Sequence, residues 1–419
     1  MRDGMRRKGL SAAAALLCGL LTLSACSGGD DAPEEPGGGG GNEQSEADRA
    51  AEDANTSEAV ISITPDDDAV NVGINSDVEV TVEGGTLDEV VMTAAGTGTE
   101  VTGTTAEDGA SWAPDAQLDR GTQYELTVQA SDAQGREAHE ARTFTTISAE
   151  NSFTGIFTPE DGETVGVGMP VSLNFDRPIT NRAEVQDAVE INTSSGQEVV
   201  GHWFSDTRLD FRPEDYWAAN TQVTVDLNFD GLEGAEGITG WQDRTFAFTV
   251  GRSQISTVDV QTHQMRVVRD GQTLRTLPIS AGSEENPTYN GAMVISEKLT
   301  ETRMNGATVG FTDDDGEGEY DIPDVPHAMR LSTSGTFVHG NYWASRGTFG
   351  SANTSHGCIG LADTQGADDP DQDAAWFFEE SLRGDVIIVT NSPDREIQPD
   401  NGLNGWNMSW DEWVAGSAL

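Results

Sequence analysis

One cysteine and two histidines in the C-terminal part of the chain are the residues whose types and spacing could do chemistry. His339 is followed by Gly340, and His356, Gly357 and Cys358 come after a stretch rich in Gly and Ser. A thiolate is a strong nucleophile, but a free thiol, with a pKa of about 8.5, needs an imidazole or a helix N-terminus to activate it. The glycine lets the backbone approach a substrate, and neighbouring N–H groups could bind an oxyanion. These residues predict catalysis by a cysteine thiolate.

The same segment resembles the signature of a known family. Residues 354–361 are Thr-Ser-His-Gly-Cys-Ile-Gly-Leu and follow His339 after a variable stretch. This resembles the L,D-transpeptidases of the YkuD family, whose signature is a histidine and, further along, Ser/Thr-His-Gly-Cys. The resemblance covers the region of residues 251–419. It includes residues 400–413, which are similar to the aromatic C-terminal subdomain of mycobacterial members.

The resemblance implies a role for each residue of the signature. Cys358 corresponds to the nucleophile, and His339 to the general base that activates it and later donates the proton. The backbone carbonyl of Gly340 occupies the place that orients the base. We expect His356 to shape the pocket, and the N–H groups of Gly357 and Cys358 to form the oxyanion hole.

Four further residues are expected at the substrate. Tyr320 and Trp343 would line the substrate groove beneath a lid, with simple packing as the alternative interpretation. Ser355 and Gly360 flank the nucleophile within the signature and are assigned to substrate binding. Gly360 departs from the family, in which this position is often Asn. The departure removes a side-chain amide from the pocket and affects the expected contacts with the donor stem.

The reaction that the resemblance implies is acyl transfer through a thioester. The thiolate attacks the carbonyl of the third residue of a peptidoglycan tetrapeptide stem, a diamino acid, and the terminal D-Ala leaves. The side-chain amine of a second stem then attacks the thioester, which gives a 3→3 crosslink. The expected partners are therefore the donor tetrapeptide and the acceptor stem. Carbapenem-type β-lactams are expected to acylate Cys358.

Alternatives for the same residues remain open. With water as the acceptor, the site would be that of an L,D-carboxypeptidase, and with a degenerate site the chain would be a non-catalytic wall-binding scaffold. Cys358, His356 and His339 are ligand types that zinc accepts, but no fourth ligand is evident. We expect neither a metal nor an organic cofactor.

The N-terminal sequence predicts a secretion signal and a membrane anchor. A basic segment at residues 2–8 precedes an apolar stretch at residues 10–23, which is typical of a signal peptide and too short to span a bilayer comfortably. Residues 23–26, Leu-Ser-Ala-Cys, resemble the bacterial lipoprotein box, so we expect a diacylated Cys26 as the membrane anchor. A plain secretory signal cleaved near Ala25 is the alternative. The predicted location is the outer face of the cell membrane, projecting into the wall.

Two tandem segments ahead of the signature repeat one pattern. Short alternating apolar runs are separated by turn residues, which is typical of an all-β sandwich. The run at residues 78–82 recurs at 171–175, and the run at 142–145 recurs at 244–247. These offsets, between 93 and 102 residues, predict two immunoglobulin-like sandwich domains.

The region after residue 252 is expected to be mostly β with little helix. Asp270-Gly271 between alternating segments predicts a hairpin, and residues 374–382 a helix. The fold class is therefore mainly β, with two immunoglobulin-like domains, a YkuD-type catalytic domain and its C-terminal aromatic subdomain. The predicted segments are a signal peptide at 1–25, a lipidated linker at 26–57, sandwich domains at 58–150 and 151–250, and the catalytic domain at 251–419.

The net charge and the number of cysteines limit which partners and which disulfides can be expected. The chain has 72 Asp and Glu against 23 Lys and Arg, a net charge of −49, which argues against nucleic-acid binding because phosphates would be repelled. Cys18 lies in the expected signal peptide and Cys26 would carry lipid. Cys358 is then alone in the folded part, so no internal disulfide is expected, and its thiol either pairs with another molecule or is reactive.

Overall fold

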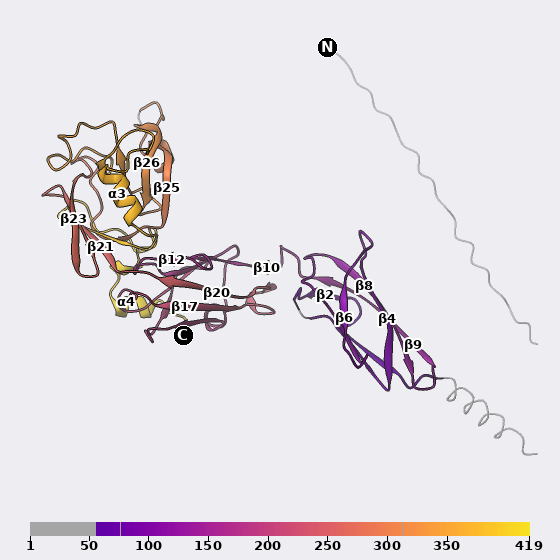
Figure 1. Ribbon diagram of the computed structural model, residues 1–419. Helices are drawn as coiled ribbons and strands as arrows, with labels where there is room; N and C mark the ends of the chain where they lie inside the picture. Colours follow the sequence, from indigo (N-terminus) through magenta and orange to yellow (C-terminus); the bar gives the residue numbers. More distant parts are fainter. Residues whose placement is uncertain (1–55, 76, 313) are drawn as a thin grey trace, which may run out of the picture. The chain divides into compact units, whose positions relative to one another are not determined.

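The computed structural model describes residues 56–75, 77–312 and 314–419, and in these residues the chain is mainly β (Figure 1). The strands form two successive sandwiches and then a nine-stranded sheet. The predicted mainly β class, with immunoglobulin-like sandwiches ahead of the signature-bearing sheet, is confirmed. The signal peptide and Cys26 lie outside the described residues, as does the linker except at residues 56 and 57. The domain limits stay predictions.

The first sandwich contains two sheets. Their strand orders are β1 (Val60–Thr64), β3 (Glu79–Glu83), β7 (Ser111–Pro114), β6 (Gly103–Thr105), and β2 (Ala69–Val72), β9 (Glu137–Thr146), β8 (Gln123–Asp132), β4 (Gly85–Ala94), β5 (Thr99–Glu100). Alternation along β8 turns Tyr124, Leu126 and Val128 into the core, while the residues between them face outward. The period of two in the sequence therefore determines which face is buried.

The second sandwich repeats this arrangement. The order of its first sheet is β11 (Gly155–Thr158), β13 (Val171–Phe175), β16 (Arg208–Arg212), β15 (Val200–Ser205). The order of its second sheet is β12 (Thr164–Val165), β20 (Asp243–Val250), β17 (Gln222–Asn228), β14 (Val189–Thr193). A small third sheet has the order β10 (Ser152–Phe153), β19 (Ile238–Gly240), β18 (Glu233–Ala235). Edge strands β2 and β12 each run parallel to their neighbour, β9 and β20. The echoed runs fall on β3 and β13 and on β9 and β20, which occupy equivalent places, so the predicted repeat is confirmed.

The signature lies in the nine-stranded sheet. Its order is β24 (Gly291–Val294), β29 (Val386–Thr390), β21 (Gln254–Asp259), β22 (Gln264–Arg269), β23 (Gln272–Ser280), β28 (Ile359–Ala362), β27 (Phe337–Asn341), β26 (Asp321–Arg330), β25 (Glu297–Asn305). Only β21 with β29 and β27 with β28 pair in parallel among these neighbours. The Asp270-Gly271 hairpin is present between β22 and β23, with both residues at positive φ, as a two-residue turn of this kind requires.

Short helices complete the described chain. They are α2 (Arg182–Asp187), η1 (Gly306–Val309), α3 (Asp373–Glu380), η2 (Gly405–Asn407) and α4 (Trp410–Ala415). Helix α3, expected at residues 374–382, packs on β26, β27 and β28 (Figure 1). Every residue of β27 and β28 is buried, which suits central strands covered on both faces. None of the helices in the described residues is long and apolar enough to cross a membrane.

The aromatic C-terminal segment packs around one buried guanidinium. Arg212, at the end of β16, lies 4.7, 5.4 and 4.4 Å from the rings of Trp406, Trp410 and Trp413. It donates to the Met408 carbonyl at 3.1 Å, and burial lowers its pKa to about 10. The three tryptophans therefore serve packing, and they join this C-terminal segment to the second sandwich.

Candidate active site

Parallel pairing of two central strands brings the histidine and the cysteine of the signature to one place. In the register of β27 and β28, His339 lies opposite Gly360. Cys358 precedes β28 by one residue. Because side chains alternate along a strand, Cys358 and Gly360 point to the same face. Strand pairing thereby brings together His339 and Cys358, which are 19 positions apart in the sequence.

The turn that presents Cys358 is held by Ser355. The Ser355 hydroxyl donates to the Cys358 carbonyl at 2.6 Å and accepts the Gly357 N–H at 3.2 Å. Gly357 has φ +106°, which an L side chain rarely adopts, so this position requires glycine. Because the Gly357 N–H is already engaged, the Cys358 N–H, which has no hydrogen bond to another described residue, is the donor left for an oxyanion.

The thiol is buried in an apolar setting. Cys358 is 9% exposed and packs with Ala328 and Phe337, with Met304 at the edge of the cluster. Its Sγ lies 3.5 Å from the Gly335 carbonyl. Burial disfavours the thiolate and raises the pKa of the Cys358 thiol to about 11. At neutral pH the resting residue is therefore a thiol, and it needs a base when it attacks.

His339 has the orientation and tautomer of such a base. Its Nδ1 lies 2.7 Å from the Gly340 carbonyl, which can only accept a hydrogen bond, so Nδ1 carries the proton. Nε2 is left with the lone pair. Burial lowers the pKa of His339, while the Gly340 carbonyl and Asp363 act in the opposite direction. The Trp343 ring stacks on the imidazole with 5.7 Å between centroids.

A buried carboxylate behind His339 was not predicted from the sequence. Asp363 Oδ2 lies 2.7 Å from His327 Nδ1, and both side chains are almost fully buried. A Cβ added at Gly340 would lie only 2.0 Å from Asp363 Oδ2, so the glycine makes room for this carboxylate. The one sequence signal for Asp363 is its position directly after β28.

The cysteine and the base open onto one cavity of about 380 Å³. Its lining residues are Met304, Tyr320, Ile322, His339, Asn341, Trp343, Ala344, Thr348, Thr354, Ser355, His356 and Cys358. Tyr320 and Trp343 therefore lie where a groove was expected. Ser355 is also at the wall, but its hydroxyl is used within the turn, and Gly360 is not among the lining residues. Their roles toward a substrate stay predictions.

A segment between β25 and β26 contacts His356 at the wall of the cavity. His356 Nε2 lies 3.1 Å from Glu319 Oε2, an ion pair when the imidazole is protonated. The rings of Tyr320 and Phe311 contact the imidazole at 5.0 and 5.5 Å between centroids. Burial, then the nearby Cys358 and Glu319, raise the pKa of Tyr320 to about 12. His356 thus joins the nucleophile turn to this segment.

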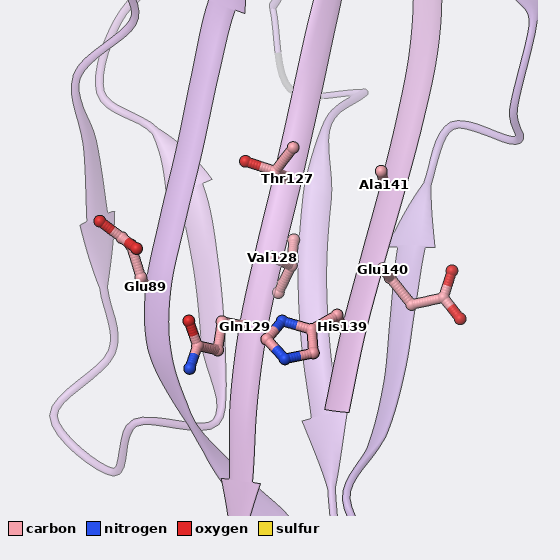
Figure 2. Close-up of a pocket in the computed structure, with 7 residues that line it drawn as sticks. All are labelled: Glu89, Thr127, Val128, Gln129, His139, Glu140 and Ala141. Carbon is pink, nitrogen blue, oxygen red and sulfur yellow. The ribbon is translucent and has the colours of Figure 1, made fainter. Parts of the chain in front are cut away.

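No metal cluster is evident in the described residues. Within residues 56–75, 77–312 and 314–419, no three His, Cys, Asp or Glu side chains are grouped so that they could hold a metal ion. Another hollow of about 380 Å³ lies on the first sandwich, where Glu89, Gln129 and His139 are cross-strand neighbours (Figure 2). Its lining contains no Ser or Cys. The cavity at Cys358 is the candidate active site because it contains both the free cysteine of the described residues and His339.

The protonation states of the site predict a pH dependence. With a thiol pKa of about 11, only about one Cys358 in ten thousand is ionised at pH 7. We expect the rate of Cys358 alkylation by iodoacetamide to keep rising between about pH 8 and pH 10, since the thiolate fraction grows throughout that range. Peptide mass spectrometry would measure this rate, with Cys358→Ala as the blank. A rate already constant near neutral pH would indicate a stable thiolate–imidazolium pair instead.

Comparisons with known proteins agree with this geometry. The L,D-transpeptidase catalytic domain family, YkuD, matches residues 253–389, and a bacterial Ig domain family, Big_10, matches residues 69–233. The chain is 33% identical to L,D-transpeptidase 2 of Mycobacterium tuberculosis over 84% of its own length and 83% of the relative's. It is 30% identical to L,D-transpeptidase 5 of the same species, over 86% and 77% of the two lengths.

Solved structures give a further likeness. An L,D-transpeptidase solved in complex with imipenem is 31% identical to this chain, with a TM-score of 0.46. The match covers 56% of this chain and 97% of that one.

Proposed function

This chain belongs to the L,D-transpeptidase family, and we propose that it forms 3→3 crosslinks in peptidoglycan through a thioester on Cys358. The observation that carries the proposal is that Cys358 and His339, whose Nδ1 is held at 2.7 Å by the Gly340 carbonyl, open onto one cavity. This arrangement supplies a nucleophile, a base of defined tautomer and room for a peptide.

The first half of the reaction transfers the donor stem to the enzyme. His339 Nε2 takes the proton of the Cys358 thiol while Sγ attacks the carbonyl carbon of the third stem residue. The oxyanion that forms is stabilised by the Cys358 N–H. As the intermediate collapses, the C–N bond to D-Ala breaks and His339 delivers its proton to the departing amine. A thioester and free D-Ala result.

The second half transfers the acyl group to another stem. The side-chain amine of the acceptor's third residue attacks the thioester carbonyl, and His339 Nε2 takes a proton from that amine. The C–S bond then breaks, and His339 returns the proton to the Cys358 sulfur. An amide joins the two third residues, and no net redox change or cofactor is required.

The same nucleophile accounts for the expected reaction with carbapenem-type β-lactams. Attack of Sγ on the lactam carbonyl forms a thioester and opens the C–N bond of the ring, whose nitrogen takes the proton. The leaving amine stays attached to the acyl group, so it cannot diffuse away as D-Ala does. We therefore expect a persistent adduct on Cys358.

Intact-protein mass spectrometry tests the acyl-enzyme. Mixing the purified chain with disaccharide-tetrapeptide should give a species heavier by the mass of the tetrapeptide compound less one D-Ala. Peptide mapping should locate it at Cys358. A chain that binds the compound without this covalent gain would instead be the wall-binding scaffold. A gain that decays to tripeptide alone would favour the L,D-carboxypeptidase.

We also propose that a diacylated Cys26 anchors the enzyme at the outer face of the cell membrane. The support is the Leu-Ser-Ala-Cys motif after an apolar stretch, together with a substrate that lies outside the membrane. Cys26→Ala is expected to remove labelling by a palmitate analogue and to release the protein from the membrane fraction. Unchanged labelling and fractionation of the variant would contradict the anchor.

A further inference from the structure

Asn341 is a buried amide beside the reacting groups that the mechanism above does not use. It lies two residues after His339 on β27, so the two side chains share one face. It lines the same cavity as Cys358. We propose that the Asn341 side-chain amide donates a hydrogen bond to an oxygen of the donor stem, and so fixes the stem for attack. This role rests on the proposed function.

The hydrogen bonds determine which way this amide points. Asn341 Oδ1 accepts the Ala344 N–H at 2.9 Å. The oxygen must therefore be the atom on the Ala344 side, since a backbone N–H cannot bond to an NH₂ group. This leaves Nδ2 directed away from Ala344. It makes no hydrogen bond to any residue that the structure describes, although the residue is only 7% exposed.

The Asn341 amide lies next to Gly360 of the neighbouring strand. His339 lies opposite Gly360 in the parallel register, and Asn341 is the next residue on that face of β27. A Cβ added at Gly360 would lie 3.4 Å from Asn341 Nδ2 and 3.5 Å from Asn341 Cβ. The Asn341 amide therefore lies directly beside the place that the first atom of a side chain at position 360 would take. The amide donor that is missing at position 360 is thus supplied by Asn341 on the neighbouring strand.

The chemistry of the amide defines its ligand. Nδ2 carries two hydrogens and can only donate, so its partner must be an acceptor such as a carbonyl or carboxylate oxygen. An amide donor at the cavity wall loses its water partner when a ligand covers it, so a substrate oxygen there is favoured over an apolar group. A tetrapeptide stem offers both kinds of oxygen close to its scissile bond. The peptide carbonyls and the D-Ala carboxylate are distinguished by the test below.

Two substitutions separate the donor from the rest of the side chain. Asn341→Asp keeps an oxygen for the Ala344 N–H and replaces only the NH₂ group by an acceptor, whereas Asn341→Ala removes both. The second-order rate of acyl-enzyme formation with disaccharide-tetrapeptide is expected to fall about tenfold in Asn341→Ala and further in Asn341→Asp. Alkylation of Cys358 by iodoacetamide, which needs no stem contact, should stay within about twofold in Asn341→Ala.

A rescue variant makes the test specific. Gly360 lies outside the positive-φ residues, and its added Cβ would meet neighbours at ordinary contact distances, so the position can accept a side chain. Asn341→Ala combined with Gly360→Asn returns an amide to the same space and should recover part of the lost acylation rate. If the partner is the D-Ala carboxylate, the loss in Asn341→Ala should shrink with a tetrapeptide whose C-terminus is an amide. If it is a peptide carbonyl, the loss should be the same for both donors.

The outcomes against the proposal are distinct. Equal acylation rates in the wild type and both Asn341 variants would overturn the role of Asn341 and leave the proposed function intact. A parallel loss of acylation and alkylation in Asn341→Ala would assign the residue to the support of the fold and also overturn the proposal. A wild-type chain that forms no acyl-enzyme would overturn the proposed function, and this role with it.

Discussion

Cys358→Ala is expected to abolish both acyl-enzyme and crosslinked product, with a loss of about 10⁴-fold or more. Within residues 56–75, 77–312 and 314–419, Cys358 is the one cysteine on which a thioester can form. Removing one buried sulfur leaves the surrounding packing of Ala328 and Phe337 largely in place. Product analysis by liquid chromatography and mass spectrometry would measure the loss.

Cys358→Ser is the matched control for this prediction. It keeps nearly the same volume and a group that can donate a hydrogen bond, but a hydroxyl is a weaker nucleophile than a thiol at the same base. We expect it to unfold at nearly the wild-type temperature and still to form almost no product. Full product formation by either variant would show that Cys358 is not the nucleophile.

His339→Gln is expected to lower the rate of acylation by about 10²- to 10⁴-fold. The thiol pKa of about 11 means that almost no thiolate exists at pH 7 without a base. Glutamine can occupy a similar volume but cannot accept and return a proton. Single-turnover acylation followed by intact-protein mass spectrometry would measure the effect.

A second histidine supplies the control for this variant. His139 lies on β9 of the first sandwich, where its Nε2 is 3.3 Å from Glu137 and its side chain is exposed. We expect His139→Gln to acylate at the wild-type rate. Raising the pH should partly restore His339→Gln, because more thiol ionises directly. Acylation by His339→Gln at the wild-type rate at pH 7 would contradict the role of His339 as the base.

The elements that carry chemistry could be predicted where the sequence pattern is local. The run of residues 354–361 marks the nucleophile turn, and the Asp270-Gly271 pair marks a hairpin, because turn geometry depends on neighbouring residues. The echoes between residues 78–82 and 171–175 predicted two sandwiches with the same strand order. These features depend on the alternation of apolar residues and on the positions of glycines, and both can be read directly from the sequence.

Features that depend on contacts between distant strands could not be predicted in this way. The buried pair of His327 and Asp363 forms across β27, which lies between β26 and β28, because Gly340 leaves room for the Asp363 carboxylate. The donor role of Asn341 requires the parallel register that sets its strand beside Gly360. The expected oxyanion donor Gly357 proves to be engaged by Ser355, a contact between side chain and backbone that composition does not reveal.

Position 360 shows how a departure from a family pattern can be interpreted once the fold is available. In the sequence, Gly360 removes an amide and affects the expected contacts with the donor stem. In the structure, the neighbouring strand places the Asn341 amide in the adjoining space. The amide that is absent at position 360 is therefore matched by the amide of Asn341 on the adjacent strand.

The most direct test of the account is the structure of the product made from disaccharide-tetrapeptide alone. Tandem mass spectrometry of the products should show a dimer that has lost one D-Ala, with its new amide between the two third residues, and no such dimer with Cys358→Ala. Tripeptide without any dimer would contradict transpeptidation and identify the chain as a hydrolase. A dimer linked through a fourth residue would contradict the 3→3 assignment.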